Sequence, residues 1–268
     1  MDKITVKDLD LYYGDFKALK TVNMNIAPNE VTAFIGPSGC GKTTTLKMIN
    51  RLIEPTSGKI YINGKDIAAQ DRVELRRHIG YVIQQIGLFP NMTVAQNICV
   101  VPKLLKYDKA RCDEIVQEML QLVHMEQSAN KYPSELSGGQ QQRIGVLRAL
   151  AASPPIVLMD EPFSALDSYL KYQLELELAE TLGGFPGTVL WVSHDRGEVF
   201  RNCRRVCVID RGRSQPVTTL GELFRSPGTE AAARLSGCKN YADARPREDA
   251  VFLPCLLYTS PSPRDRTR

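Results

Sequence analysis

The spacing of apolar and polar positions along the chain predicts an alternation of buried strands and amphipathic helices. Short runs rich in Val and Ile, several of them apolar at nearly every residue, are typical of strands buried on both faces of a sheet. Segments with helical periodicity separate most of these runs, which favours a largely parallel sheet flanked by helices, that is, an α/β fold. The predicted strands are residues 4–9, 31–36, 59–63, 79–83, 155–160, 188–193 and 205–210.

One long segment has no strand pattern. Between about residues 91 and 153, the stretches 93–105, 109–125 and 138–152 all place apolar residues at helical spacing. We therefore expect a helical subdomain, about residues 91–153, inserted into an α/β domain that extends over residues 1–242.

The chain changes character after residue 242. The last part ends in Ser, Pro and Arg without a periodic apolar pattern, which is typical of disordered tails. Its final string, CLLYTSPSPRDRTR, also resembles translated sequencing-adapter sequence. We expect residues 243–268 to be a disordered or artefactual tail.

Composition narrows the class of protein. The 268 residues are 43% hydrophobic and 24% charged, as in ordinary soluble domains. The net charge of +4 is spread without dense Lys/Arg runs, so no nucleic-acid partner is expected. No apolar stretch approaches the roughly 20 residues of a membrane-spanning helix, and the start lacks a signal peptide's apolar core. The seven scattered cysteines favour reduced thiols in the cytosol over disulfides or a zinc site.

The strongest chemical signal is GPSGCGKT, residues 36–43, between a predicted strand and a helical pattern. Its glycines let backbone N–H groups and the helix start point at phosphate oxygens. Lys42 would supply charge to the β and γ phosphates, and the Thr43 hydroxyl would bind Mg²⁺. A glycine-rich turn without function is the alternative, which the flanking strand and helix disfavour. The predicted nucleotide-binding residues here are Gly36, Pro37, Ser38, Gly39, Cys40, Gly41, Lys42, Thr43 and Thr44.

Two adjacent carboxylates follow the apolar run IVLM. A buried strand would deliver Asp160 and Glu161 to its carboxyl end, where open α/β sheets bind ligands. Asp160 would then hold Mg²⁺, and Glu161 would orient or deprotonate a water that attacks the γ-phosphate. Taken alone, the pair is better explained as a solvated strand end. The phosphate loop reverses that preference.

A second helix start also carries backbone donors. LSGGQQQR opens a helical pattern with Ser137, Gly138, Gly139 and Gln140, which would point N–H groups at an anion. A simple helix cap is the alternative. Because one nucleotide does not need two phosphate-binding helix starts from the same chain, we expect a second subunit to use this one across a dimer interface.

With these motifs in this order, the chain resembles the ATP-binding cassette ATPases from about Ile4 to about Ala242. The resemblance rests on GPSGCGKT, LSGGQ, MDE and the later VSHD. It implies ATP and Mg²⁺ as cofactors. It also implies a phosphate-loop core of mostly parallel sheet, an N-terminal antiparallel β subdomain and an inserted helical subdomain. Two cassettes, as a homodimer or with a different second cassette, would bind two ATP molecules head to tail.

The resemblance assigns further positions. Tyr13 matches the aromatic residue that stacks on adenine, although the adjacent Tyr12 and a purely structural tyrosine are alternatives. Gln84 matches the glutamine that senses Mg²⁺ and the attacking water, with Gln85 as its neighbour. Asp167 matches the loop that contacts the opposite subunit, and His194 matches the switch histidine on the γ-phosphate. The resemblance thus implies Glu161, His194 and Gln84 as catalytic residues. It implies Thr43, Gln84 and Asp160 as the residues that bind Mg²⁺.

Four roles for such an ATPase are distinguishable by sequence. A chromosome or repair ATPase would place long coiled coils between Lys42 and Ser137, where no sustained heptads occur. A paired-cassette translation factor needs two phosphate loops, whereas this sequence has one. A fused exporter needs membrane spans, and no apolar stretch here is long enough for one. The remaining role is a transport ATPase that docks on separate membrane permeases at the cytoplasmic face of the membrane, with a substrate-binding protein as an indirect partner.

The cargo signals disagree along the chain. The opening resembles phosphate importers, residues from about 44 to 152 resemble glycine betaine, carnitine and choline importers, and the part after the carboxylates resembles molybdate importers. Residues 84 to about 130 would contact the permease, so they carry most partner specificity. We therefore expect a quaternary-ammonium osmoprotectant, with an oxyanion, molybdate before phosphate, as the alternative.

Overall fold

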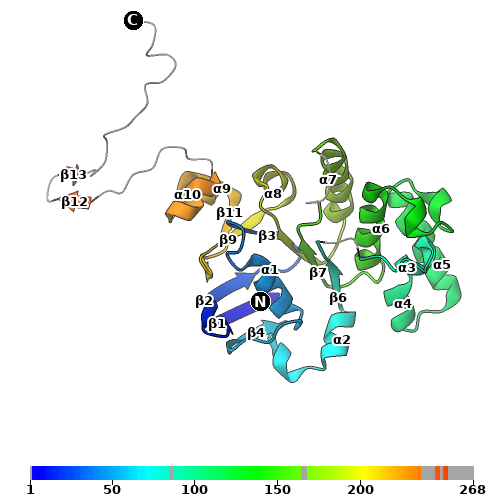
Figure 1. The fold of residues 1–268 in the computed structure, drawn as a ribbon, viewed down its shortest axis with the longest axis horizontal. Helices are drawn as coiled ribbons and strands as arrows, with labels where there is room; N and C mark the ends of the chain where they lie inside the picture. Colours follow the sequence, from blue (N-terminus) through cyan, green and yellow to red (C-terminus); the bar gives the residue numbers. More distant parts are fainter. Residues whose placement is uncertain (1, 85–86, 164–167, 237–244, 248–249, 253–268) are drawn as a thin grey trace, which may run out of the picture.

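In a computed structural model of the chain, the fold is described for residues 2–84, 87–163, 168–236, 245–247 and 250–252 (Figure 1). Two large sheets, helices that cover them, a separate group of helices and a short two-stranded hairpin make up the described part of the chain. No helix in these described ranges is both long and apolar enough to cross a membrane.

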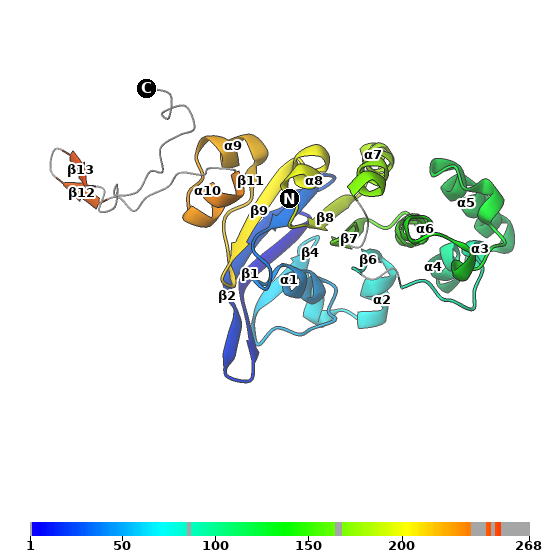
Figure 2. The same ribbon diagram turned by 45° about the horizontal axis from the view of Figure 1, so that its top comes forward.

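The first sheet is antiparallel and lies at the N-terminal end of the chain. Its strand order is β2-β1-β4-β5. The register runs from Ile4 opposite Ile26 to Tyr13 opposite Phe16, across a hairpin whose turn holds Gly14 at φ +57°. This hairpin projects from the body in Figure 2. The strands are β1 (Ile4–Tyr13), β2 (Phe16–Ile26), β4 (Ser57–Ile62) and β5 (Lys65–Asp66).

Strand β2 was not among the predicted strands, although it is the longest strand that the structure describes. Its apolar residues do not alternate strictly, because the register with β1 shifts between the pairs Leu9–Val22 and Leu11–Leu19. Thr21, between these positions, takes a left-handed φ of +52°. A bulge of this kind interrupts the two-residue period on which strand prediction depends.

The second sheet is mostly parallel, with strand order β10-β9-β3-β8-β7-β6. Strands β3, β6, β7, β8 and β9 run parallel, whereas β10 and β11 pair antiparallel with β9. The predicted α/β fold, with an antiparallel N-terminal sheet, is confirmed. The strands are β3 (Val31–Ile35), β6 (Ile79–Val82), β7 (Ile156–Asp160), β8 (Thr188–Val192), β9 (Arg205–Asp210), β10 (Arg213–Ser214) and β11 (Thr218–Thr219).

Helices pack against both faces of this sheet. Helix α1 lies between the two sheets, and α7 and α8 cover the opposite face (Figures 1 and 2). Several of these helices begin at residues whose side chains accept backbone N–H groups, such as Asp71, Asp195 and Thr219. The helices are α1 (Lys42–Ile49), α2 (Arg72–Arg77), α7 (Ser168–Gly183), α8 (Arg196–Asn202), α9 (Leu220–Arg225) and α10 (Glu230–Ser236).

A group of helices lies beyond β6, at one end of the molecule (Figure 1). It comprises α3 (Val94–Ile98), α4 (Val100–Leu104), α5 (Lys109–Leu122) and α6 (Gly138–Leu150), and it has its own apolar cluster. The stretch 93–105 forms two helices that meet at Cys99. Pro102 explains the break, since it has no N–H to donate to the Ile98 carbonyl and its ring crowds that residue.

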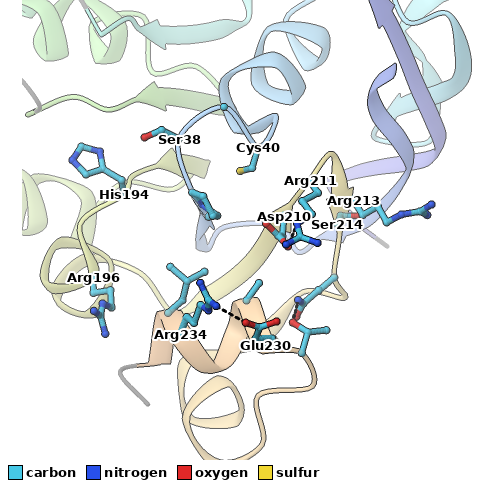
Figure 3. A pocket seen from close by; sticks show the side chains of 17 residues that line it. Ser38, Cys40, His194, Arg196, Asp210, Arg211, Arg213, Ser214, Glu230 and Arg234 are labelled. Carbon is cyan, nitrogen blue, oxygen red and sulfur yellow. Dashed lines mark hydrogen bonds and ion pairs between the residues drawn. The ribbon is translucent and has the colours of Figure 1, made fainter. Parts of the chain in front are cut away.

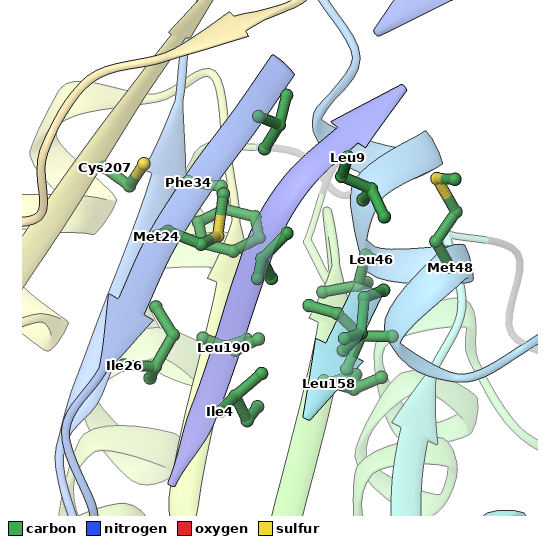
Figure 4. Close-up of a cluster of buried hydrophobic side chains, with 14 of the residues drawn as sticks. Ile4, Leu9, Met24, Ile26, Phe34, Leu46, Met48, Leu158, Leu190 and Cys207 are labelled. Atoms are coloured by element: carbon green, nitrogen blue, oxygen red, sulfur yellow. The ribbon is translucent and has the colours of Figure 1, made fainter. Parts of the chain in front are cut away.

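The core joins the two sheets. Alternate residues of β7 face different layers, with Ile156 and Leu158 turned toward the antiparallel sheet and Val157 and Met159 toward α6 and α7. Figure 4 shows Leu158 near Leu46 of α1, and Leu190 near Ile4 of β1. Because every residue of β7 is buried, the strand is held rigidly up to its last residue, Asp160.

Within the range predicted to be a disordered or artefactual tail, the structure describes a short antiparallel hairpin of β12 (Arg245–Arg247) and β13 (Ala250–Phe252).

Candidate functional site

The loop between β3 and α1 is shaped by glycines where the backbone approaches its neighbours. A Cβ on Gly36 would collide with the Ile209 carbonyl oxygen of β9 and with the Cys40 sulfur. Gly41 has φ +110°, and a Cβ there would meet the Leu19 side chain. The loop can therefore lie flat against β2 and β9 and lead directly into α1, which begins at Lys42.

Lys42 is held inside this loop. Its side chain is 5% exposed, and its ammonium donates to the carbonyl oxygens of Gly36 at 2.8 Å and Pro37 at 2.9 Å. The Cys40 sulfur lies 3.8 Å away. An ammonium carries three protons, and the third points to the weakly accepting Cys40 sulfur, so a phosphate at the mouth of the loop would be a stronger partner for it.

The next residue connects the loop to the carboxylate pair. The Thr43 hydroxyl donates to Asp160 Oδ1 at 2.7 Å, and the Tyr81 hydroxyl lies 3.5 Å from Asp160 Oδ2. Asp160 is 3% exposed, and burial raises the pKa of its carboxyl despite the hydrogen bond from Thr43. Hydroxyl and carboxylate oxygens are the donors that Mg²⁺ prefers, so Thr43 and Asp160 fit this ion.

Glu161 turns away from the strand that precedes it. It has a left-handed φ of +48°, and its N–H donates to the Val192 carbonyl at 3.0 Å. A non-glycine residue in this region is strained, and such residues concentrate at functional sites. The turn directs the carboxylate of Glu161 to a different place from that of Asp160.

Two predicted catalytic groups flank the Glu161 carboxylate. Gln84 Nε2 donates to Oε2 at 3.3 Å, and His194 Nδ1 lies 3.3 Å from Oε1. Gln84 follows β6 and His194 follows β8, the two strands that neighbour β7 in the sheet. The parallel order therefore brings Gln84, Glu161 and His194 together at one sheet edge.

The LSGGQ segment starts α6. Ser137 caps this helix, since its hydroxyl accepts from the Gln140 N–H at 3.3 Å and Gln140 Oε1 accepts from the Ser137 N–H at 3.0 Å. Ser137 and Gly138 are exposed, whereas Gly139 is buried. The helix also reaches the carboxylate pair, because the buried Gln142 donates its amide to the Pro162 carbonyl.

Tyr13 lies at the end of β1, beside the hairpin turn. It is 51% exposed, and Tyr12 is 43% exposed. The Lys17 ammonium lies 5.3 Å from the centre of the Tyr12 ring. The Lys17 ammonium thus covers a face of the Tyr12 ring within the hairpin, which makes Tyr13 the better candidate for adenine stacking. Asp167 and Gln85 lie outside the described residues.

An open pocket of about 940 Å³ adjoins the outer side of the phosphate loop. Figure 3 shows Ser38, Cys40 and His194 on one side of it and α10 on the other. The arginines that line it come from three separate segments, the β9–β10 hairpin, α8 and α10. No single sequence motif therefore identifies them. They are Arg196, Arg211, Arg213 and Arg234, and the last pairs with Glu230 at 2.5 Å.

Residues 19–164 match the family model described as "ABC transporter". The chain is 50% identical over 242 residues to the glycine betaine/carnitine/choline transport ATP-binding protein OpuCA of Bacillus subtilis, covering 90% of this chain and 64% of that protein. It is 41% identical over 248 residues to the glycine betaine uptake system ATP-binding protein YehX of Escherichia coli, covering 88% and 80%. The chain thus spans less than two thirds of the length of the first of these relatives.

Solved structures agree with this similarity. A dimeric, post-hydrolysis ATP-binding cassette bound to ADP and Pi is 34% identical, with a TM-score of 0.71 over 81% of this chain and 98% of that one. The protein cbiO1 of Clostridium perfringens, part of the ABC transporter complex cbiONQ, is 29% identical, with a TM-score of 0.76 over 84% and 92%. A family match over more than half of the sequence, supported by this fold and these relatives, shows that the chain belongs to the ABC transporter family.

Proposed function

We propose that the chain is an ATP-hydrolysing, nucleotide-binding subunit of an importer. The observation that carries the chemistry is the placement of Glu161 between Gln84 and His194, next to the Thr43–Asp160 hydrogen bond. A carboxylate here can accept a proton from water, and a histidine and a glutamine beside it can orient that water and a phosphate oxygen.

The phosphate loop would bind the nucleotide through its backbone. N–H groups of residues 38–44 and the start of α1 would meet the phosphates, and Lys42 would add its charge and the proton that now points to the Cys40 sulfur. Tyr13 would stack on adenine through its exposed ring. We assign Gly36, Pro37, Ser38, Gly39, Cys40, Gly41 and Thr44 to the same cradle.

The oxygen donors of Thr43, Asp160 and Gln84 would hold Mg²⁺. Bound to a triphosphate, this ion neutralises charge that develops on the phosphate oxygens. Burial of Asp160 makes its ionised form costly, which a divalent cation would offset. The hydroxyl of Tyr81 behind it keeps the second oxygen of Asp160 in place.

Two copies of the chain would form one pair of sites. Ser137 and Gly138 are exposed at the start of α6, so the N–H groups there are accessible to a phosphate held by another subunit. We assign Ser137, Gly138, Gly139 and Gln140 to this role and Asp167 to the subunit contact. The partner is a second copy or a different cassette.

We propose a quaternary-ammonium osmoprotectant, glycine betaine, carnitine or choline, as the cargo. The 50% identity to OpuCA extends over 90% of the chain, well past Glu161, and so includes the part whose motifs resemble molybdate importers. The partners would be membrane permeases, contacted at the cytoplasmic face of the membrane, and through them a substrate-binding protein. An oxyanion such as molybdate remains the alternative cargo.

Glu161→Gln tests the hydrolytic site. The amide keeps the shape of the side chain but does not accept a proton as a carboxylate does, so we expect ATP turnover to fall by about 100-fold or more. ATP affinity should persist, and the ATP-loaded variant should elute as a dimer in size-exclusion chromatography. Turnover close to that of the unmodified chain would exclude Glu161 as the base.

Two further variants complete this test. Glu126→Gln, at an exposed position remote from these motifs in the sequence, is the matched control and should leave turnover unchanged. Lys42→Ala should instead abolish ATP binding in an equilibrium titration, because it removes the ammonium from the phosphate loop. Undiminished ATP affinity in Lys42→Ala would contradict the assignment of the loop.

A further inference from the structure

His194 lies in a short loop whose two neighbouring residues are both anchored. On one side, the buried Ser193 hydroxyl donates to Glu198 Oε2 and accepts from the Asp195 N–H at 3.0 Å. On the other side, Asp195 caps α8 by accepting the Glu198 N–H at 3.3 Å. His194 itself is 56% exposed, so its place depends on Ser193 and Asp195 rather than on packing around its own ring.

Lys171 of helix α7 contacts two carboxylates that hold this loop, Asp195 and Glu198. Its ammonium is 2.6 Å from Asp195 Oδ2 and 3.8 Å from Glu198 Oε2, and its side chain is only 17% exposed. This contact holds the pKa of the Asp195 carboxyl below its usual range. Burial opposes the charged form of Lys171, yet its pKa is raised, because Asp195, Glu198 and Glu175 together outweigh that effect.

The same cluster continues along α7. Glu175, one turn after Lys171, is 1% exposed and accepts from Arg201 Nε of α8 at 2.8 Å. Lys171 Nζ lies 4.0 Å from Glu175 Oε1. Three carboxylates thus share two cations, and two of these carboxylates are deeply buried, Glu175 at 1% and Glu198 at 3% exposure. Charged groups at this depth hold their geometry tightly, because losing a partner leaves a buried charge uncompensated.

We infer that Lys171 is a positioning residue that fixes His194 against Glu161 by tying α7 to the loop of residues 193–195. The inference rests on the proposed role of His194 in hydrolysis. Helix α7 begins at Ser168, shortly after the carboxylate pair in sequence. A movement of α7 would therefore reach the loop of His194 through the Lys171 ammonium, without passing through the nucleotide.

The expected effect is on turnover and not on ATP binding. In the part of the chain that the structure describes, the charged partners of Lys171 are Asp195, Glu198 and Glu175, none of them assigned to the phosphates. Replacing Lys171 should therefore leave KM for ATP within about twofold while kcat falls. A displacement of a reacting group by about 1 Å can cost roughly 100-fold in rate. We expect Lys171→Met to lose about 10- to 100-fold in kcat, and Lys171→Arg, which keeps the charge, to recover most of it.

Asp195→Asn provides a second probe that spares the fold. Asparagine caps a helix about as well as aspartate does, so α8 should keep its start. Only the charge attraction to Lys171 is lost, and the Lys171 ammonium keeps Glu198 Oε2 at 3.8 Å and Glu175 Oε1 at 4.0 Å, so the substitution leaves no buried charge unpaired. It should lower kcat in the same direction as Lys171→Met, with the thermal midpoint unchanged.

The decisive measurement is a double-mutant cycle with His194→Ala in the full chain, with kcat, KM and thermal midpoint recorded for each variant. If Lys171 acts through His194, then Lys171→Met and Asp195→Asn lower kcat in the unmodified chain and have almost no further effect once His194 is alanine. Lys65→Met, at an exposed position of β5 outside all assigned residues, is the matched control and should change nothing.

The possible results distinguish the proposed role of His194 from the inferred role of Lys171. Unchanged turnover in His194→Ala would overturn the proposed role of His194. A large effect of His194→Ala, combined with equal losses from Asp195→Asn in both backgrounds or with normal kcat in Asp195→Asn, would overturn the role of Lys171 alone. If Lys171→Met does not fold, the kcat values of Asp195→Asn and Lys171→Arg test the role of Lys171 instead.

Discussion

Glu161 shows how backbone conformation and chemistry are coupled at a single residue. Its left-handed φ of +48° is unfavourable for a side chain with a Cβ, and the hydrogen bond from its N–H to Val192 stabilises it. The result is that two consecutive carboxylates do different work. Asp160 stays buried with Thr43, and Glu161 faces Gln84 and His194.

Buried thiols give a residue-scale prediction about pH. Burial raises the pKa of Cys207, in the centre of β9, to about 12, compared with 9.0 for an ordinary thiol. A thiol whose pKa is higher in the folded state favours folding below pH 9.0, and this contribution is lost as the pH rises toward 12. The free energy of unfolding should therefore fall between about pH 8 and about pH 10, and Cys207→Ala should reduce this fall.

Urea unfolding at the two pH values measures this effect. Val206→Ala, on the same strand, is the control, because it also removes buried atoms but carries no ionisable group. It should lower stability equally at both pH values. An identical pH dependence in Cys207→Ala and the unmodified chain would show that Cys207 does not contribute.

At the scale of elements, three helix starts surround the proposed chemistry. Helix α1 begins in the phosphate loop, α6 follows its cap Ser137, and α8 follows its cap Asp195, the residue after His194. Only α6 and α8 have a side-chain cap. Gly41, before α1, provides none and leaves the first N–H groups of that helix for a phosphate.

Ser137 allows capping to be separated from nucleotide contact. Aspartate caps a helix as well as serine does and also suits the helix dipole, so Ser137→Asp should leave the thermal midpoint unchanged or raise it slightly. If the start of α6 meets a phosphate of the partner's nucleotide, the added negative charge should abolish ATP turnover. Normal turnover would mean that Ser137 serves only as a cap.

At the scale of the whole molecule, the α/β core and the α3–α6 helix group are joined at the site itself. Gln142 of α6 donates to the Pro162 carbonyl directly after the carboxylates, and Arg148 of the same helix donates to the Gly87 carbonyl at 2.7 Å, shortly after Gln84. Rotation of the helix group would therefore move the backbone next to Glu161 and close to Gln84.

Uptake measurements test the cargo. The chain, produced with the permease and binding protein of a glycine betaine importer that lacks its own ATPase, should restore uptake of labelled glycine betaine. Glu161→Gln should not, which shows that uptake depends on hydrolysis by this chain. Restored uptake with the corresponding proteins of a molybdate importer, and none with the betaine set, would favour the oxyanion alternative.

Sequence patterns predicted the parallel strands and the phosphate loop because both depend on local order. A strand buried on both faces is apolar along its length, as β7 and β8 are, and the loop needs glycines at fixed spacing. Strand β2 escaped prediction because a bulge in its pairing with β1 breaks the alternation. The division of 93–105 at Cys99 was also missed, although Pro102 gave a local signal for it.

The sequence by itself determined the family, the fold class and the kinds of groups available for chemistry, because these follow from residue types at short spacing. Only the tertiary structure decided which groups meet. Gln84 and His194 flank Glu161 because β6 and β8 are the neighbours of β7, and Lys171 reaches Asp195 because α7 packs against α8. Contacts of this kind depend on strand order and helix packing, which distant parts of the chain set together and no local pattern encodes.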